Sequence, residues 1–352
     1  MSEAELIVAV DRRAGRLTLN RPKALNAVTY EMVTELERAL LAWRDDPDVE
    51  LIVVDAAPGR AFAAGGDIRD LYEHGKAGDF AFGRRFWADE YRMNALIANY
   101  PKPVVTLVDG IVMGGGVGVA SHASHRVASE RTVLAMPECG IGLIPDVGGT
   151  FRLSRAPGRL GEYLALTGAR VGAADAILTG FADFHVPSAR LEALTDRLAE
   201  TGDPLEVAGF ATDPAKVEDP AVAPFLAAIR PGIDESFSAP SPLAILAALR
   251  PRAEPWAEDA AKAIRRGAPL SVACALVAVR EARKADRIED ALALEYRFAW
   301  RCSEEGEFLE GIRAVVIDKD RDPHWAIPRL EDVTPERVAA MLAPLGEDEL
   351  RL

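Results

Sequence analysis

Two acidic side chains, Glu138 and Asp146, stand eight residues apart in a stretch rich in glycine and proline. Carboxyl groups held in such a loop can serve as general acid, general base or nucleophile. Upstream, Gly114-Gly115-Gly116 follows the apolar, β-branched run Val104–Val108, and glycine there lets the backbone approach a ligand closely. A helix that begins after these glycines would direct free backbone N–H groups toward that ligand. The stretch therefore predicts an acyl site that combines hydrogen-bond donors with acids.

A second glycine-containing loop, Ala63-Ala64-Gly65-Gly66-Asp67-Ile68, lies upstream of the first. Glycine clusters alone also serve turns and helix packing, so only the two loops together form a strong signal. We expect Ala64 and Gly114 to contribute to substrate binding. Asp67 is expected either to bind substrate as well or to have a structural role, in which its side chain caps or braces its own loop.

The acids also have ordinary structural explanations. Glu138 follows a proline and could be a solvated loop acid, and Asp146 could simply begin the Pro-Asp-Val-Gly turn. Glu90 is harder to explain in this way, because it lies in a predicted helix at 79–99 among aromatic residues that favour core packing. A carboxylate in such surroundings needs a partner or a raised pKa.

The composition argues against several classes of protein. A formal net charge of −14 over 352 residues gives no reason to expect a nucleic-acid or membrane partner. Cys139, Cys274 and Cys302 lack disulfide or zinc spacing, and His122 and His125 lack a third ligand, so no metal is expected. Cys139 is expected to pack as a small apolar group. The cysteines and the absence of a leader-like amino terminus predict a cytoplasmic location.

The spacing of apolar residues predicts an α/β chain. Residues 6–10 and 16–20 are expected to form a hairpin, residues 29–43 an amphipathic helix, and residues 51–54 a buried strand. This order indicates a partly parallel layer. Residues 180–187 are expected to be a connector.

The carboxyl-terminal part of the sequence is predicted to be mainly helical. Helices are expected at 270–284, 288–302 and 308–317, and Thr334 before Pro335 predicts the start of the last helix. The change in composition near Thr201 predicts a core over residues 1–200 and a helical extension over residues 201–352.

Together the two glycine loops and the Met136-Pro137-Glu138 and Pro145–Gly149 segments resemble the enoyl-CoA hydratase/isomerase (crotonase) superfamily. The resemblance implies a crotonase-like α/β fold of repeated ββα units with a helical C-terminal region. It also implies a CoA thioester substrate and an oxyanion hole made by the N–H groups of Gly66 and Gly115. Such donors stabilise the charge that gathers on a thioester oxygen under attack.

Within the superfamily, the resemblance is to the 3-hydroxyisobutyryl-CoA hydrolase family of valine catabolism. A hydratase of this superfamily would carry a glutamate at position 118, where this sequence has Gly118, and a second at Glu138. The hydrolases share both Glu138 and Asp146, and their substrate-binding position falls on Glu90. The expected reaction is therefore hydrolysis of a short β-hydroxyacyl-CoA, with an enoyl-CoA hydratase/isomerase or a non-catalytic CoA-ester binding protein as alternatives.

The expected mechanism leaves two routes open, because Glu138 could attack the thioester itself or activate the water that does. Asp146 would bind the β-hydroxyl group or help to protonate the departing thiolate. No cofactor is expected, since coenzyme A is part of the substrate. The expected partner is the acyl-CoA, with no nucleic acid and no membrane, and a homo-oligomer is possible.

Overall fold

The computed structural model describes residues 4–214 and 224–352 of the chain. The chain divides into two compact units that interleave along the sequence. The first unit consists of Met1–Gly66, Arg92–Ala135 and Arg170–Phe225, and the second of Asp67–Tyr91, Met136–Ala169 and Leu226–Leu352. Both units draw on residues before and after position 200, and the functional division expected there stays a prediction.

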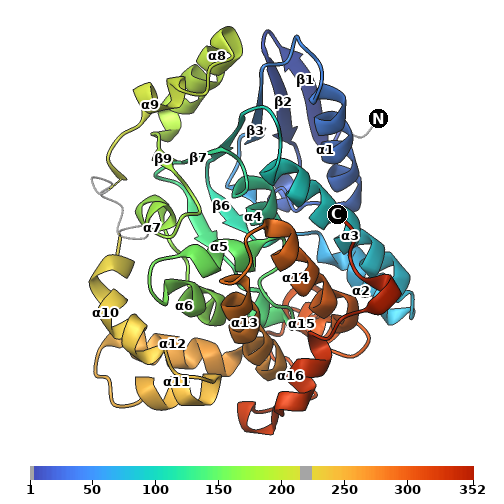
Figure 1. Ribbon diagram of the computed structural model, residues 1–352, viewed down its shortest axis with the longest axis vertical. Helices are drawn as coiled ribbons and strands as arrows, with labels where there is room; N and C mark the ends of the chain where they lie inside the picture. Colours follow the sequence, from blue (N-terminus) through green and yellow to red (C-terminus); the bar gives the residue numbers. More distant parts are fainter. Residues whose placement is uncertain (1–3, 215–223) are drawn as a thin grey trace. The chain divides into compact units, whose positions relative to one another are not determined.

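The first unit is built on a six-stranded sheet of order β1-β2-β3-β5-β7-β9 (Figure 1). Its strands, in chain order, are β1 (Leu6–Asp11), β2 (Ala14–Leu19), β3 (Leu51–Ala56), β5 (Val104–Val108), β7 (His125–Ala128) and β9 (Phe184–His185). β1 and β2 form the predicted antiparallel hairpin, and every later neighbour pairs in parallel. The parallel pairing confirms the expected layer. β9 lies within residues 180–187, where the expectation of a simple connector is wrong.

A second, three-stranded parallel sheet accompanies the first and has the order β4-β6-β8. Its strands are β4 (Ala61–Ala63), β6 (Ile111–Met113) and β8 (Val133–Ala135). Each follows one strand of the larger sheet, so that the pairs β3-β4, β5-β6 and β7-β8 repeat along the chain. This repetition of two strands before a helical segment is the expected ββα pattern.

Helices complete the first unit. They are η1 (Pro22–Ala24), α1 (Tyr30–Trp43), the last turns of α3 (Phe80–Ala98), α4 (Gly115–Ala120), α7 (Ala173–Leu178), η3 (Ser188–Arg190), α8 (Leu191–Thr201) and α9 (Glu206–Phe210). The predicted amphipathic helix is α1, which begins where the Thr29 side chain accepts a hydrogen bond from the Met32 N–H (3.2 Å). α8 buries Leu194 and Leu198 against β-strand residues such as Val53 and Val105.

The second unit is helical. Its elements are α2 (Ile68–Lys76), the first turns of α3 (Phe80–Ala98), η2 (Glu138–Ile141), α5 (Gly149–Arg155), α6 (Leu160–Thr167), α10 (Leu226–Ser236), α11 (Pro242–Leu249), α12 (Pro255–Arg266), α13 (Pro269–Ala282), α14 (Ile288–Cys302), α15 (Phe308–Ile312), the π-helical turn Arg313–Ile317, η7 (Leu330–Asp332), α16 (Pro335–Met341) and η8 (Gly346–Asp348). The predicted C-terminal helices are confirmed, including the Thr334 cap, which accepts from the Arg337 N–H (3.2 Å).

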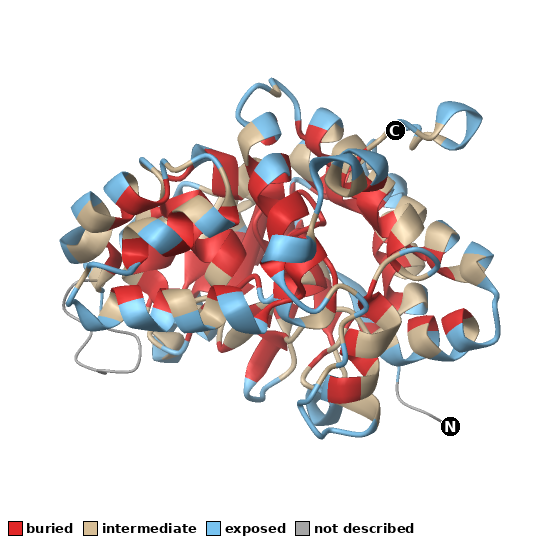
Figure 2. Cartoon of the chain, turned by 90° about the horizontal axis from the view of Figure 1, so that it is seen from below, coloured by how far each residue is buried: buried red, intermediate tan, exposed pale blue. Residues whose placement is uncertain are grey.

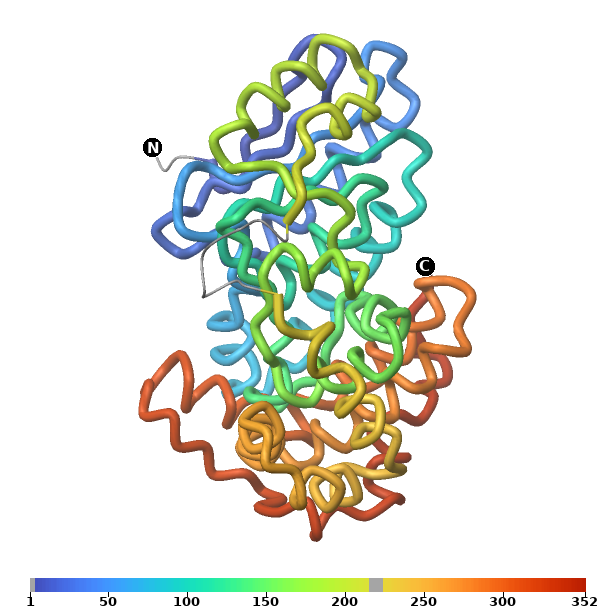
Figure 3. The backbone as a smooth tube through the Cα atoms, turned by 90° about the vertical axis from the view of Figure 1, so that its left-hand side faces the viewer, coloured from blue at the N-terminus to red at the C-terminus, as the bar shows by residue number. Residues whose placement is uncertain are grey.

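α13 lies at the centre of the second unit and is buried along most of its length. It packs against α5 and α6, and α14 packs against both α13 and α5. Figure 3 shows the orange and red C-terminal helices beside the green α5–α6 segment. Buried residues, red in Figure 2, line the strands and the inner faces of these helices. Among the described residues, no helix has the length and apolar character needed to cross a bilayer.

Candidate active site

The two glycine loops lie side by side in the first unit. β4 and β6 are parallel neighbours, and one loop follows each of them. A Cβ atom on Gly65 would lie 3.8 Å from the Met113 carbonyl oxygen, and one on Gly116 would lie only 2.4 Å from the Ala63 carbonyl oxygen. Because no side chain fits at such a distance, Gly116 is required for the close approach of α4 to β4.

Both loops use backbone conformations that favour glycine. Gly65 has φ +120° and Gly114 has φ +47°. Ala64 and Gly65 are fixed by hydrogen bonds to residues 25 and 28: the Ala64 N–H donates to the Leu25 carbonyl (3.0 Å), and the Gly65 carbonyl accepts from the Val28 N–H (2.9 Å). Two backbone hydrogen bonds therefore anchor the loop that is expected to donate to a ligand.

The predicted donors Gly66 and Gly115 occupy suitable backbone positions. Gly115 is the first residue of α4, so its N–H precedes the hydrogen-bond ladder of that helix. Gly66 forms a parallel bridge with Val28. Asp67 occupies the N-cap position of α2, but its side chain makes no capping hydrogen bond there. Donation by Gly66 and Gly115 to a thioester oxygen stays a prediction, as does binding by Ala64, Asp67 and Gly114.

The acids Glu90, Glu138 and Asp146 come together in the second unit. Their exposed fractions are 3%, 3% and 4%, so none is a solvated surface acid. Glu138 begins η2, and Asp146 begins a turn in which its carbonyl accepts from the Gly149 N–H (2.6 Å). Asp146 thus starts the turn suggested by its sequence and is also a buried carboxyl group beside two others.

Burial controls the electrostatics of these acids. It raises the pKa of Glu138 and of Glu90 well above the ordinary value, and the nearby charge of Asp146 raises both further. Burial also raises the pKa of Asp146 to about 7, although a hydrogen bond from Tyr91 opposes the rise. No lysine or arginine in the described chain contributes to these three shifts. Burial therefore favours the protonated form of each of these acids more than exposure to solvent would, which suits a role in proton transfer.

The hydrogen bonds within the cluster are uneven. The Tyr91 hydroxyl donates to Asp146 Oδ2 (2.8 Å). Within the described residues, Glu90 Oε1 and Glu138 Oε2 are buried without a hydrogen-bond partner. A buried polar atom without a partner is costly, so these oxygens are suited to bind a polar group of a ligand.

Two residues of this region are not evident from sequence patterns. Tyr91 belongs to the aromatic stripe of α3, which indicates only core packing, although its hydroxyl contacts Asp146. Glu295 on α14 is completely buried and accepts hydrogen bonds from the Asp146 turn. The only sequence signal for such a residue is a glutamate on the apolar face of a predicted helix.

Neighbouring residues that could suggest other chemistry have structural roles. The Cys139 thiol donates to the Ala165 carbonyl (3.4 Å), and burial raises its pKa well above the ordinary value, which disfavours a thiolate nucleophile. Position 118 lies in the buried helix α4 and provides no carboxyl group. In the described part of the chain, no group of three or more His, Cys, Asp or Glu side chains is arranged to hold a metal ion.

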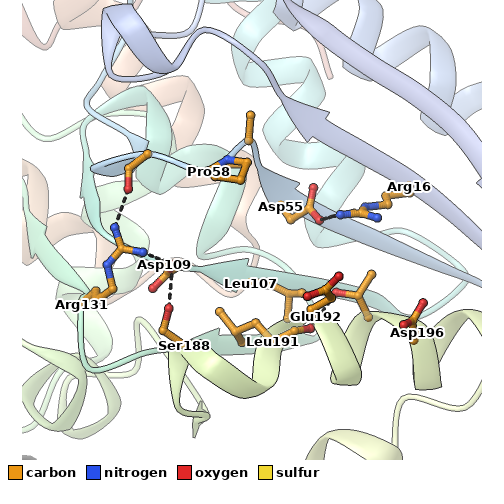
Figure 4. Close-up of a pocket in the computed structure, with 14 residues that line it drawn as sticks. Arg16, Asp55, Pro58, Leu107, Asp109, Arg131, Ser188, Leu191, Glu192 and Asp196 are labelled. Carbon is orange, nitrogen blue, oxygen red and sulfur yellow. Dashed lines mark hydrogen bonds and ion pairs between the residues drawn. The ribbon is translucent and has the colours of Figure 1, made fainter.

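A recess of about 410 Å³ lies in the first unit, with lining residues from β2, β3 and α8 (Figure 4). Its charged groups are largely paired with one another: Arg16 donates to Asp55 (2.6 Å), and Arg131 donates to Asp109 (2.6 Å). Ser188 also donates to Asp109 (3.0 Å). None of the residues predicted to act in catalysis lines this recess. Because the protein itself satisfies these groups, we assign no ligand to the recess.

Curated relatives match the chain along its whole length. A relative from Gallus gallus, named 3-hydroxyisobutyryl-CoA hydrolase, mitochondrial, is 38% identical and aligns over 100% of this chain and 92% of its own. A relative of the same name from Rattus norvegicus is 40% identical over 98% of this chain and 90% of its own.

Solved structures are similar to the chain in fold and in sequence. One described as an enoyl-CoA hydratase from Rhodobacter sphaeroides has a TM-score of 0.91 and 48% identity, covering 99% of this chain and 100% of its own. One described as a carnitinyl-CoA dehydratase from Mycobacterium thermoresistibile has a TM-score of 0.93 and 43% identity, covering 99% of both chains. The family profile described as Enoyl-CoA hydratase/isomerase matches residues 14–342. The chain belongs to the enoyl-CoA hydratase/isomerase family.

Proposed function

We propose that this protein hydrolyses a short β-hydroxyacyl-CoA thioester, namely 3-hydroxyisobutyryl-CoA, to 3-hydroxyisobutyrate and CoA in valine catabolism. The observation that carries the proposal is the buried cluster of Glu138, Asp146 and Glu90, combined with the lack of an acid at Gly118. Full-length similarity to relatives named 3-hydroxyisobutyryl-CoA hydrolase supports the choice of substrate.

In the proposed reaction, the N–H groups of Gly66 and Gly115 bind the thioester oxygen as it gains negative charge. Removing one essential donor of this kind costs about 3–4 kcal/mol of transition-state stabilisation. The Glu138 carboxylate attacks the carbonyl carbon, the C–S bond breaks, and water then opens the resulting anhydride to release the acid. Alternatively, Glu138 removes a proton from the water that attacks directly.

Asp146 and Glu90 are proposed to act on the polar parts of the substrate. Asp146, whose pKa lies at about 7, can give a proton to the departing thiolate and recover one from water. The unpartnered Glu90 Oε1 is suited to accept a hydrogen bond from the β-hydroxyl group. The same unit thus offers a proton donor and a hydroxyl acceptor for a β-hydroxyacyl group.

A hydratase activity on an enoyl-CoA is the second candidate. It is favoured by the similarity to solved structures described as a hydratase and a dehydratase, at 48% and 43% identity. The absence of a second acid at Gly118 opposes it, since two carboxyl groups are expected to handle one water in hydration.

One experiment separates the two candidates and a protein that only binds CoA esters. The purified protein is offered 3-hydroxyisobutyryl-CoA, 3-hydroxypropionyl-CoA and crotonyl-CoA, and thiol release and enoyl absorbance are followed separately. Thiol release from the two hydroxyacyl esters is expected. Loss of enoyl absorbance without thiol release would instead establish a hydratase, and tight binding with no turnover would establish a binding protein.

The remaining features of the proposal concern the setting of the reaction. We propose that the enzyme needs no cofactor and acts in the cytoplasm, and its oligomeric state is left open for measurement. All three cysteines are free and buried, which is compatible with a reducing compartment, whereas several relatives are named mitochondrial. Activity after treatment with a chelator tests whether a cofactor is needed. Cell fractionation tests the location, and light scattering of the purified chain measures the oligomeric state.

A further inference from the structure

The turn that carries Asp146 has an unusual backbone conformation. Val147 has φ +53° and the following Gly148 has φ +78°. Glycine adopts the left-handed region readily, but a β-branched residue such as valine rarely does, and the surrounding structure must hold it there. The local sequence therefore does not explain this turn by itself.

Glu295 holds the turn from α14. Its Oε2 accepts from the Gly148 N–H (2.7 Å), and its Oε1 accepts from the Thr150 N–H (2.9 Å) and from the Thr150 hydroxyl group. Glu295 is fully buried, so water does not compete for these donors. Three hydrogen bonds to one carboxyl group thus fix the backbone immediately after Val147.

The next residue on α14 supports the other partner of Asp146. The Tyr296 ring meets the Tyr91 ring edge-on, with ring centroids 6.1 Å apart and an interplanar angle of 74°. Tyr91 in turn donates to Asp146 Oδ2. Two consecutive residues of α14 therefore support Asp146: Glu295 holds its turn, and Tyr296 packs against the Tyr91 ring whose hydroxyl donates to its carboxyl group.

We propose that Glu295 is a positioning residue, whose carboxyl group holds Val147 in its left-handed conformation and thereby keeps the Asp146 carboxyl group against the Tyr91 hydroxyl. The proposal rests on the hydrolase function assigned above, in which Asp146 takes part. It also gives the C-terminal helical region a role in catalysis, because α14 becomes part of the support for the acid cluster.

The decisive measurement is the pKa of Asp146, followed by NMR with isotope-labelled aspartate. Several titratable groups act on Asp146 or are affected by its charge: Glu90, Tyr91, Glu138, Glu295 and Cys302. The Tyr91 hydrogen bond lowers the pKa of Asp146. If Glu295 positions Asp146, Glu295→Gln weakens that bond and raises this pKa. Burial raises the pKa of Glu295 itself to about 8, so Glu295 is mostly uncharged where Asp146 titrates. If Glu295 did not position Asp146, its replacement would therefore leave the pKa of Asp146 unchanged or lower it.

Activity provides a second readout on the full-length enzyme. Glu295→Gln places an amide NH₂ where a carboxyl oxygen accepts, so we expect kcat to fall about tenfold to hundredfold with KM changed less than about threefold. The matched control is Glu307→Gln. Like Glu295, Glu307 is a buried glutamate of the second unit, and it accepts a hydrogen bond from the backbone N–H of Ile327 (2.9 Å). Its substitution should leave kcat within about twofold of the wild-type value.

A milder pair of variants guards against misfolding of Glu295→Gln. Thr150→Val removes one donor to Glu295 while keeping the size of the side chain, and it should lower kcat and raise the pKa of Asp146 in the same direction. Thr150→Ser keeps the hydroxyl group and should restore both toward the wild-type values.

The effects of Tyr91→Phe and Glu295→Gln should not multiply, since both act on one hydrogen bond. Multiplying effects on kcat, a lowered pKa of Asp146 in Glu295→Gln, or an unchanged pKa with unchanged kcat would each overturn the proposal. If the wild type released no thiol from any CoA ester, the assigned function would fail, but the NMR comparison would still decide whether Glu295 positions Asp146.

Discussion

Replacing Asp146 with asparagine should change how the stability of this protein depends on pH. The Asp146 side chain is 4% exposed, and burial raises its pKa from 3.8 to about 7. Asparagine retains an oxygen that can accept from the Tyr91 hydroxyl, but it cannot take up a proton. The variant therefore removes the titration and keeps most of the local packing.

The sign and size of the effect follow from proton linkage. The folded state binds the Asp146 proton more tightly than the unfolded chain does, so wild-type stability from this group is lost as pH rises through about 7 and is fully present below about 3.8. A pKa difference of this size corresponds to about 4 kcal/mol in total. Between about pH 8 and pH 5, the unfolding free energy of wild type minus that of Asp146→Asn should increase by about 2.5 kcal/mol.

Urea unfolding at a series of pH values measures this difference directly. The control is Asp332→Asn, because Asp332 pairs with Arg329 on the surface, where the pKa of Asp332 is lowered and does not titrate in this range. Its difference from wild type should stay flat. Parallel stability curves for wild type and Asp146→Asn across this range would refute the assignment of a raised pKa to Asp146.

Three further predictions test the site and its support. Glu138→Gln should lower the rate of thiol release by about a thousandfold or more while preserving binding of the CoA ester. In the wild-type enzyme, entry of label from ¹⁸O-water into Glu138 under single-turnover conditions would mark the covalent route. Glu90→Gln should lower the preference for 3-hydroxyisobutyryl-CoA over isobutyryl-CoA, which lacks the hydroxyl, by about tenfold, as measured by the two kcat/KM values. Gly116→Ala should lower the unfolding free energy measured in urea by about 2 kcal/mol or more, since its Cβ would meet the Ala63 carbonyl. The control Gly209→Ala places its Cβ in open space and should not lower the unfolding free energy.

Local sequence signals predict much of this architecture because they depend on neighbouring residues. The hairpin of β1 and β2 and the α14 boundaries follow from apolar spacing, and α16 follows from its Thr334 cap. The eight-residue interval from Glu138 to Asp146 likewise indicates paired acids, because one short segment holds both. These signals need no knowledge of what packs against them.

The contacts that give the acids their properties depend on distant residues. The Tyr91 donor lies 55 residues before Asp146, and Glu295 lies 147 residues after Gly148, so no periodicity links them. The left-handed conformation of Val147 also contradicts the local preference of valine and is evident only once Glu295 is in place. The division into two interleaved units also cannot be predicted from local sequence patterns, because each unit is assembled from segments that lie far apart in the chain.

The raised pKa of Glu138 has a consequence for the proposed chemistry. A carboxyl group that attacks a thioester must first lose its proton, and burial makes that loss less favourable for Glu138 than for an exposed glutamate. Asp146 is the neighbour that can accept this proton, because its own pKa lies at about 7. The proton can then pass from Asp146 to the departing thiolate, and Asp146 returns to the ionised form that activates water. A pair that must hold one proton between its two members should give kcat/KM a bell-shaped dependence on pH. A plain sigmoid would indicate that a single ionisation controls the reaction, and it would contradict the shared proton.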